Sequence, residues 1–140
     1  MTGYLLDTNV ISELRKRRPS ASVTKWVGQA PETSLYVSVI SLGELRIGIE
    51  LVADSKKRLE LERWLVFELT PRFAERVLSF DRTVADRWGV LEAQARRNGR
   101  RLPAIDTMLA ATALALGLTL VTRNTRDFAQ TGAAILNPWY

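Results

Sequence analysis

The chain alternates short apolar runs with longer segments in which apolar residues recur every three or four positions. The short runs predict β-strands at residues 4–6, 34–39, 76–80, 118–122 and 133–136. The longer segments, such as 45–52 and 84–95, predict amphipathic helices. This alternation is typical of an α/β fold, in which helices cover both faces of a central parallel sheet.

Capping and turn residues support these boundaries. Asp81 is placed to cap a helix that begins near Arg82, and Asn98-Gly99 would end it. Gly117 lies between the following helix and the next strand, and a break near Asp54-Ser55 divides a helical pair. Because no repeat, low-complexity tract or Gly/Ser linker interrupts the pattern, we predict a single domain over residues 1–140.

The composition narrows the possible chemistry. The 140 residues are 46% hydrophobic, which suits an ordinary globular core, and they include no cysteine and no histidine. Thiolate nucleophiles, zinc-thiolate sites, imidazole ligands and His-dependent catalysis are therefore excluded. An enzyme built from this chain would depend on carboxylates, and any metal would be a hard cation such as Mg²⁺ or Mn²⁺.

The net charge of +5 favours a polyanionic partner, although a basic surface also serves solubility alone. The longest weakly polar segment, residues 108–121, is too short to span a bilayer. We therefore expect a cytoplasmic protein with no membrane association.

Four carboxylates follow predicted strands or open a helix, and each has a structural explanation of its own. Asp7 could cap the next helix, and Glu44 could form a capping box with Ser41. Asp106 could interact with a helix dipole, and Asp127 could belong to an ordinary turn with Asn124.

A parallel sheet changes this interpretation because it brings strand ends that are distant in sequence to one edge. Asp7, Glu44, Asp106 and Asp127 would then crowd together and raise one another's pKa, so a divalent cation is the natural counter-charge. We therefore interpret Asp7 as a metal ligand at a strand end, with Thr8 and Asn9 orienting it.

Four stretches carry a family resemblance, in the family's order and over nearly the whole chain. They are LLDTNVISEL, SVISLGELRIGI around Glu44, PAIDTMLAATALALG around Asp106 and VTRNTRDF around Asp127. Together they resemble PIN-domain ribonucleases, specifically the VapC-type toxins of prokaryotic toxin-antitoxin pairs. The closing ILNPWY is similar to the FitB-like branch.

The resemblance implies a three-layer PIN-domain sandwich and a metal-dependent endoribonuclease that uses Mg²⁺ or Mn²⁺. Asp7, Glu44, Asp106 and Asp127 match the four acidic catalytic and metal-binding positions. Thr122 and Asn124 match the small polar residues that support the family's pocket. Asn9, which we expect to orient Asp7, is the third supporting residue. Thr107 departs from the more usual alanine and adds a hydroxyl near the site.

The expected reaction is hydrolysis of an RNA phosphodiester by a metal-activated water, which leaves 5′-phosphate and 3′-hydroxyl ends. Arg100, Arg101, Arg123 and Arg126 are candidates for phosphate contacts, although each could equally belong to a solvated surface. The run at 15–18, RKRR, could serve either as such a contact or as a helix C-terminal charge cluster.

The resemblance also implies a cognate antitoxin, which would cover the helical pair at residues 41–69 near Trp64 and Phe67. A homodimer is expected, and DNA would be contacted only through the antitoxin.

Two other functions share some of these features. A phospho-accepting receiver domain would need an adjacent acidic pair and a late lysine, which this chain lacks, and a non-catalytic binding protein would show no metal-dependent turnover.

Overall fold

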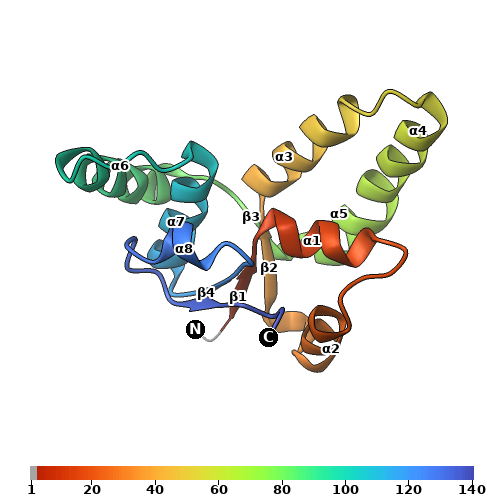
Figure 1. The fold of residues 1–140 in the computed structure, drawn as a ribbon, viewed down its shortest axis with the longest axis horizontal. Coiled ribbons are helices and arrows are strands. Elements are labelled where there is room, and N and C mark those ends of the chain that lie inside the picture. Colours follow the sequence, from red (N-terminus) through yellow and green to blue (C-terminus); the bar gives the residue numbers. More distant parts are fainter. Residues whose placement is uncertain (1–2) are drawn as a thin grey trace.

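The computed structural model describes residues 3–140 as a five-stranded parallel sheet in the order β3-β2-β1-β4-β5 (Figure 1). The strands are β1 (Tyr4–Leu6), β2 (Leu35–Ser38), β3 (Val77–Leu78), β4 (Thr119–Val121) and β5 (Ile135–Leu136). Every neighbouring pair is parallel, which confirms the sheet predicted from the apolar runs.

Helices occupy the connections between strands. They are α1 (Thr8–Arg15), α2 (Ala21–Gln29), α3 (Val39–Glu50), α4 (Ser55–Arg63), α5 (Thr70–Phe73), α6 (Arg82–Arg97), α7 (Ala104–Leu116) and α8 (Thr125–Phe128). Short 3₁₀ turns lie at Glu32–Ser34 and Ala74–Arg76, and a π-helical turn at Trp64–Leu69 joins α4 to α5. In Figure 1, α6, α7 and α8 lie to the left of the strands and α1 and α2 to the right, which confirms the three-layer arrangement.

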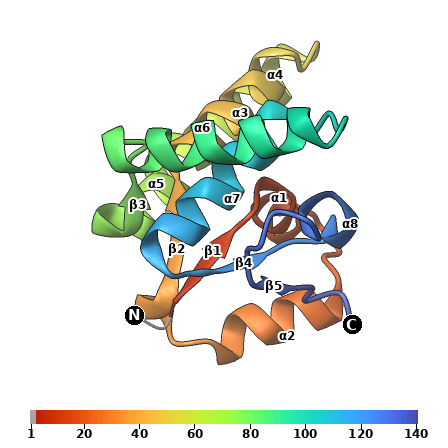
Figure 2. The ribbon, with the colours of Figure 1, turned by 90° about the vertical axis from the view of Figure 1, so that its left-hand side faces the viewer.

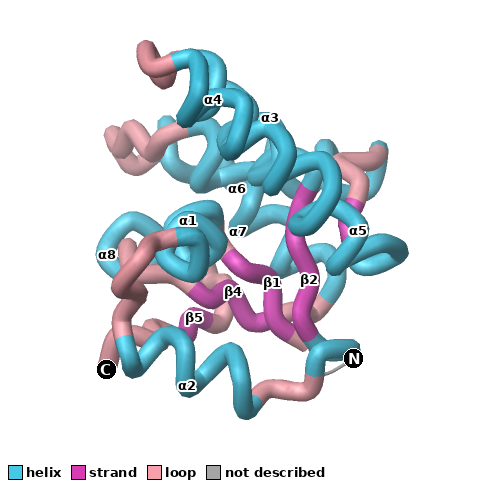
Figure 3. Tube along the Cα trace, turned by 90° about the vertical axis from the view of Figure 1, so that its right-hand side faces the viewer, coloured by secondary structure: helices cyan, strands magenta, loops and turns pink. Residues whose placement is uncertain are grey.

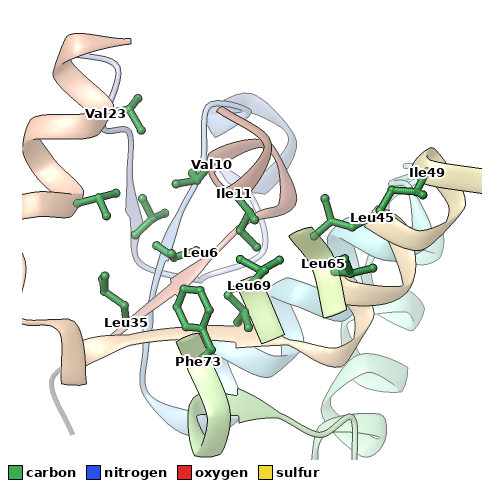
Figure 4. Packing of buried hydrophobic residues seen from close by; sticks show 13 residues of the cluster. Leu6, Val10, Ile11, Val23, Leu35, Leu45, Ile49, Leu65, Leu69 and Phe73 are labelled. Atoms are coloured by element: carbon green, nitrogen blue, oxygen red, sulfur yellow. The ribbon is translucent and has the colours of Figure 1, made fainter. Parts of the chain in front are cut away.

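Alternating side chains of the central strands supply two cores, one on each face of the sheet. Leu5 and Leu120 pack toward α6 and α7, whereas Leu6 and Val121 pack toward α1, α2 and α5. Figure 4 shows the second of these cores, where Phe73 from α5 lies near Leu6. Because both faces of the sheet are buried, β1 reads as a continuous apolar run.

Several predicted helix ends are confirmed. The Asp81 side chain accepts from the N–H of Val84 at the start of α6, and Asp54 caps α4. Gly117 ends α7 with φ of 67°, a left-handed conformation that glycine adopts without steric cost.

The capping box considered as an alternative for Ser41 and Glu44 does not form. Helix α3 begins one turn earlier, where the Ser38 side chain accepts from the N–H of Ile40. Ser41 therefore lies inside the helix, buried and with no hydrogen-bond partner for its hydroxyl among residues 3–140. Glu44 does not cap the helix and lies in the second turn of α3.

Helices α3 and α4 form an arm beyond the carboxyl edge of the sheet (Figure 3). Of the two aromatic residues predicted on its surface, Phe67 is 73% exposed, whereas Trp64 packs partly into the core beneath the Arg15 guanidinium. Within residues 3–140, no helix is long and apolar enough to cross a membrane.

The buried Thr107 hydroxyl links α7 to α6. It accepts from Trp88 Nε1 at 3.0 Å and lies 2.8 Å from Glu92 Oε1, to which it can donate. Figure 2 shows α6 lying across α7. Because Thr107 follows Asp106 directly, this contact fixes the first turn of α7 and hence the place of that carboxylate.

Replacing Thr107 with valine should lower the free energy of unfolding by about 1–3 kcal/mol, because the Trp88 N–H and the Glu92 carboxylate lose a buried partner without a change in side-chain volume. Urea denaturation would measure the effect. Thr24→Val, at an exposed position of α2, is the control. Equal stability of the two variants would show that the hydroxyl does not secure the α6–α7 contact.

Candidate active site

The site begins at Asp7, which follows the last residue of β1. Its N–H donates to the Val121 carbonyl at 2.9 Å, so the chain is still held against β4 at this point. One carboxylate oxygen, Oδ1, accepts from the N–H of Thr8 at 2.7 Å and caps α1. Asp7 therefore follows the end of a strand and also caps the next helix, so the two interpretations of this residue are compatible.

The second oxygen of Asp7 is held by Thr122 at the end of the neighbouring strand β4. Thr122 Oγ1 donates to Asp7 Oδ2 at 2.7 Å and accepts from Asn9 Nδ2 at 3.4 Å and from the N–H of Asn124 at 3.0 Å. Asp7 is only 4% exposed, so this network fixes the carboxylate in one orientation. Thr122 thus contacts Asp7 directly, and Asn9 through its side chain and Asn124 through its backbone N–H both bond to Thr122.

A cavity of about 390 Å³ opens beside Asp7 at the carboxyl edge of the sheet. It is lined by Asp7, Thr8, Asn9, Ser12, Glu13, Lys16, Glu44, Asp106, Arg123, Asn124 and Trp139. Three of the four predicted carboxylates therefore meet in one cavity, although Asp7 and Glu44 are 37 positions apart and Glu44 and Asp106 are 62 positions apart in the sequence.

Asp127 lies in the short helix α8 and does not line this cavity. It is still close enough to act electrostatically, because its charge contributes to raising the pKa values of Asp7 and Asp106. Asp127 therefore lies near Asp7 and Asp106 but outside the lining of the cavity.

The environment disfavours ionisation of two of these carboxyls. Burial raises the pKa of Asp7, against the opposing effect of its hydrogen bonds from Thr122 and Thr8. Burial, followed by the charges of Asp7, Asp127 and Glu44, raises the pKa of Asp106 from 3.8 to about 6. The charges of the neighbouring carboxylates therefore add to the effect of burial in raising the pKa of Asp7 and of Asp106.

No side chain of residues 3–140 compensates for this charge by direct pairing. The ion pairs in this part of the chain involve Glu13, Glu32, Glu50, Glu62 and Glu92, and none involves the four predicted carboxylates. An unpaired carboxylate as buried as Asp7 is costly unless a cation faces it. The donor set is entirely oxygen, which suits a hard divalent cation.

The spacing of the acidic groups limits how such a cation could bind. Within residues 3–140, no three acidic side chains lie close enough to enclose an ion directly. Mg²⁺ commonly keeps several waters and takes one or two carboxylates, so the arrangement fits a largely hydrated ion. Thr8 Oγ1 and Asn9 Oδ1, both buried at the cavity without a hydrogen-bond partner among residues 3–140, could bond to such waters.

The lining also includes Ser12, Glu13 and Trp139, which were not among the residues selected from the sequence. Glu13, 6% exposed, accepts from Lys16 Nζ at 2.9 Å and from the N–H of Ser20 at 2.8 Å, and these bonds lower its pKa. The Arg123 guanidinium lies 5.3 Å from the centre of the Trp139 ring, beside the carboxylates. The spacing of Thr8, Ser12 and Lys16 at intervals of four does indicate one face of α1.

The four arginines proposed for phosphate contacts fall in different places. Arg123 lines the acidic cavity, whereas Arg100 lines a separate hollow with Gln94 and Arg97 of α6. Arg101 and Arg126 are exposed and line neither of these cavities. Thr107, whose hydroxyl was expected near the site, is also absent from the lining and bonds toward α6 instead.

Comparison with known proteins gives consistent matches over almost the whole chain. The family model for the PIN domain matches residues 4–134. The plasmid stability protein StbB of Pseudomonas syringae is 43% identical, over 96% of this chain and 97% of its own length. Toxin FitB of Neisseria gonorrhoeae is 38% identical (97% and 98% covered), and the VapC ribonuclease Y4jK of Sinorhizobium fredii is 39% identical (96% of each covered).

The fold has an equally clear counterpart among solved structures. The crystal structure of FitAcB from Neisseria gonorrhoeae contains a chain that superposes with a TM-score of 0.91 and is 37% identical. The match covers 98% of this chain and 99% of that one. The similarity therefore includes the carboxyl edge of the sheet as well as the core.

Replacing Asp106 with asparagine should stabilise the metal-free protein at neutral pH. A raised pKa means that the folded state disfavours the ionised carboxyl, so the penalty is fully present above about pH 6 and disappears as the pH falls toward the unfolded value. Because Asp106 is partly exposed, solvent screening reduces the expected gain to about 1 kcal/mol.

Urea denaturation in EDTA at about pH 7.5 and about pH 4 would measure this difference. Asp86→Asn, at an exposed position of α6, is the control for loss of a carboxylate. A destabilised Asp106→Asn protein at neutral pH, or a gain that does not change with pH, would contradict the electrostatic description of the cavity.

Proposed function

Because the chain belongs to the PIN-domain family, as a VapC-type toxin of the FitB-like branch, we propose that it is a metal-dependent endoribonuclease that hydrolyses RNA phosphodiester bonds. One observation carries this proposal. Asp7, Glu44 and Asp106, from three distant parts of the sequence, line one cavity, and no cationic side chain in the described part of the chain is paired with them. A relative named VapC ribonuclease supports RNA as the substrate.

Different residues would bind the metal ion and the substrate. Asp7, Glu44 and Asp106 would hold Mg²⁺ or Mn²⁺, with Asp127 adding negative charge nearby. When bound, the cation supplies an activated water and stabilises charge on the leaving oxygen. Thr122 keeps Asp7 oriented, so its carboxylate does not have to reorganise during the reaction.

Positive groups at the same cavity suit a phosphate. Arg123, held over the Trp139 ring, and Lys16, held by Glu13, both line the cavity. Attack of water on phosphorus breaks the bond to the 3′ oxygen, which leaves as a hydroxyl after taking up a proton. The products would carry 5′-phosphate and 3′-hydroxyl ends.

We also propose a cognate antitoxin as the protein partner in the cytoplasm. Similar solved structures include FitAB bound to a DNA fragment, in which the matched chain is 35% identical with a TM-score of 0.90 over 98% of this chain and 96% of that one. The arm formed by α3 and α4 exposes Ile47, Leu51 and Leu59, and Phe67 follows it, which suits coverage by an apolar partner segment. DNA would then be reached through the antitoxin, and the toxin would form a homodimer.

The test is cleavage of a mixed RNA pool by the purified chain, freed of antitoxin. Cutting should require Mg²⁺ or Mn²⁺, stop in EDTA, and fall at least about 100-fold in Asp7→Asn because the cation loses its most buried ligand. Sequencing of the ends should find 5′-phosphate and 3′-hydroxyl termini.

Asp86→Asn, far from the cavity, is the matched control and should cut like the parent. Ends bearing 2′,3′-cyclic phosphate would refute hydrolysis by water. A folded, antitoxin-free chain that cuts no RNA with either cation would instead favour a non-catalytic PIN-like binding protein.

A further inference from the structure

A second cavity, of about 650 Å³, lies between the C-terminal part of α1 and the N-terminal part of α4. Five cationic residues line it: Arg15, Lys16, Arg17, Lys56 and Lys57. We call this surface the α1–α4 cleft. Its lining includes only two carboxylates, Asp54 and Glu60, so the cleft carries a net positive charge.

Most of this charge is available to a ligand. Among residues 3–140, Arg17, Lys56 and Lys57 form no ion pair with a carboxylate, and all three are exposed. Arg15 also has no carboxylate partner within this described part of the chain, and it lies over the Trp64 ring, 5.8 Å from its centre. Since paired surface charges are already neutralised, this concentration of unpaired cations indicates an anionic ligand.

The cleft adjoins the acidic cavity. Ser12 and Lys16 line both, so the two hollows share a wall on one face of α1. The hollow that contains Arg97 and Arg100, by contrast, shares no lining residue with the acidic cavity. Among these basic surfaces, the α1–α4 cleft is therefore the one that leads into the site.

We propose that the α1–α4 cleft binds the sugar-phosphate backbone of single-stranded RNA next to the bond that is cut. This inference rests on the proposed nuclease function. An endonuclease acts within a chain, so its substrate must extend out of the cavity over neighbouring surface. Lysine and arginine side chains along two helices can each contact a phosphate without reading a base.

An RNA strand fits the two hollows together better than an acidic peptide does. At the cavity end of the path, the Arg123 guanidinium lies over the Trp139 ring and lines the cavity, where it can contact a phosphate or stack on a base. A positive groove that ends at a group able to stack on a base suits a single strand. An acidic peptide would use the positive charge alone.

The test compares two triple variants that remove the same charge. Arg17→Gln/Lys56→Gln/Lys57→Gln alters the cleft, and Lys25→Gln/Arg82→Gln/Arg87→Gln alters exposed positions of α2 and α6. Fluorescence anisotropy in EDTA would measure binding of a labelled single-stranded RNA of about 12 nucleotides, at salt concentrations from about 50 to 200 mM. Thermal melting would verify that both variants are folded.

The cleft variant should bind this RNA at least about tenfold more weakly than the parent at low salt, and its salt dependence should fall by about 2 logarithmic units per decade, since each lost contact removes about 0.7. The control variant should stay within about twofold of the parent. Equal losses in the two variants would overturn the proposal, because they would reflect net charge alone. A polyglutamate peptide that depends on the cleft as strongly as the RNA does would also overturn it.

Cleavage of the same RNA with Mn²⁺, measured in parallel, separates this inference from the nuclease proposal. If the parent protein cuts RNA and the two triple variants bind RNA equally well, the proposed role of the cleft is wrong and the nuclease proposal stands. If the parent protein does not cut RNA but its RNA binding depends on the cleft, the cleft is an RNA-binding surface and the nuclease proposal is wrong.

Discussion

The hydrogen bond from the Thr122 hydroxyl to the Asp7 carboxylate joins the ends of the neighbouring strands β1 and β4. It holds an almost wholly buried acid at the edge of the sheet, where α1 begins on one side and the chain turns toward α8 on the other. The rest of the site follows from this placement. Glu44 and Asp106 add like charge to the same cavity, and with no cationic side chain of residues 3–140 paired to these acids, a divalent cation is the remaining way to balance them.

The acidic and basic groups around the site lie on two adjoining surfaces. Acidic groups gather in the cavity at the strand ends, and basic groups gather in the α1–α4 cleft beside it, with Lys16 belonging to both. This division suits a substrate whose own charge is negative throughout. A cation can bring one phosphate to the carboxylates, while exposed lysines and arginines attract its neighbours.

Periodicity and capping residues were enough to predict the strands and most helix ends, because burial on both faces of a parallel sheet leaves a strong apolar signal. Ser41 shows where local patterns fail: Ser38 offers the same cap one turn earlier, and only the packing of α3 decides between them. Glu13 and Trp139 could not be selected from the sequence, because the buried place of Glu13 depends on its bond from the Ser20 N–H and because the C-terminal segment brings Trp139 to the cavity. Asp127 was grouped with the other acids by its place after a strand, but it lies in the short helix α8, outside the lining of the cavity.

The claim on which this account depends is that the acidic cavity holds a divalent cation through Asp7. Calorimetric titration of Mn²⁺ into the antitoxin-free protein tests it most directly, without any need for RNA or turnover. The account predicts saturable binding by the parent protein and by Asp86→Asn, and loss of at least about tenfold in affinity in Asp7→Asn, since the ion loses a buried carboxylate. Equal Mn²⁺ affinity in the parent protein and in Asp7→Asn would contradict it.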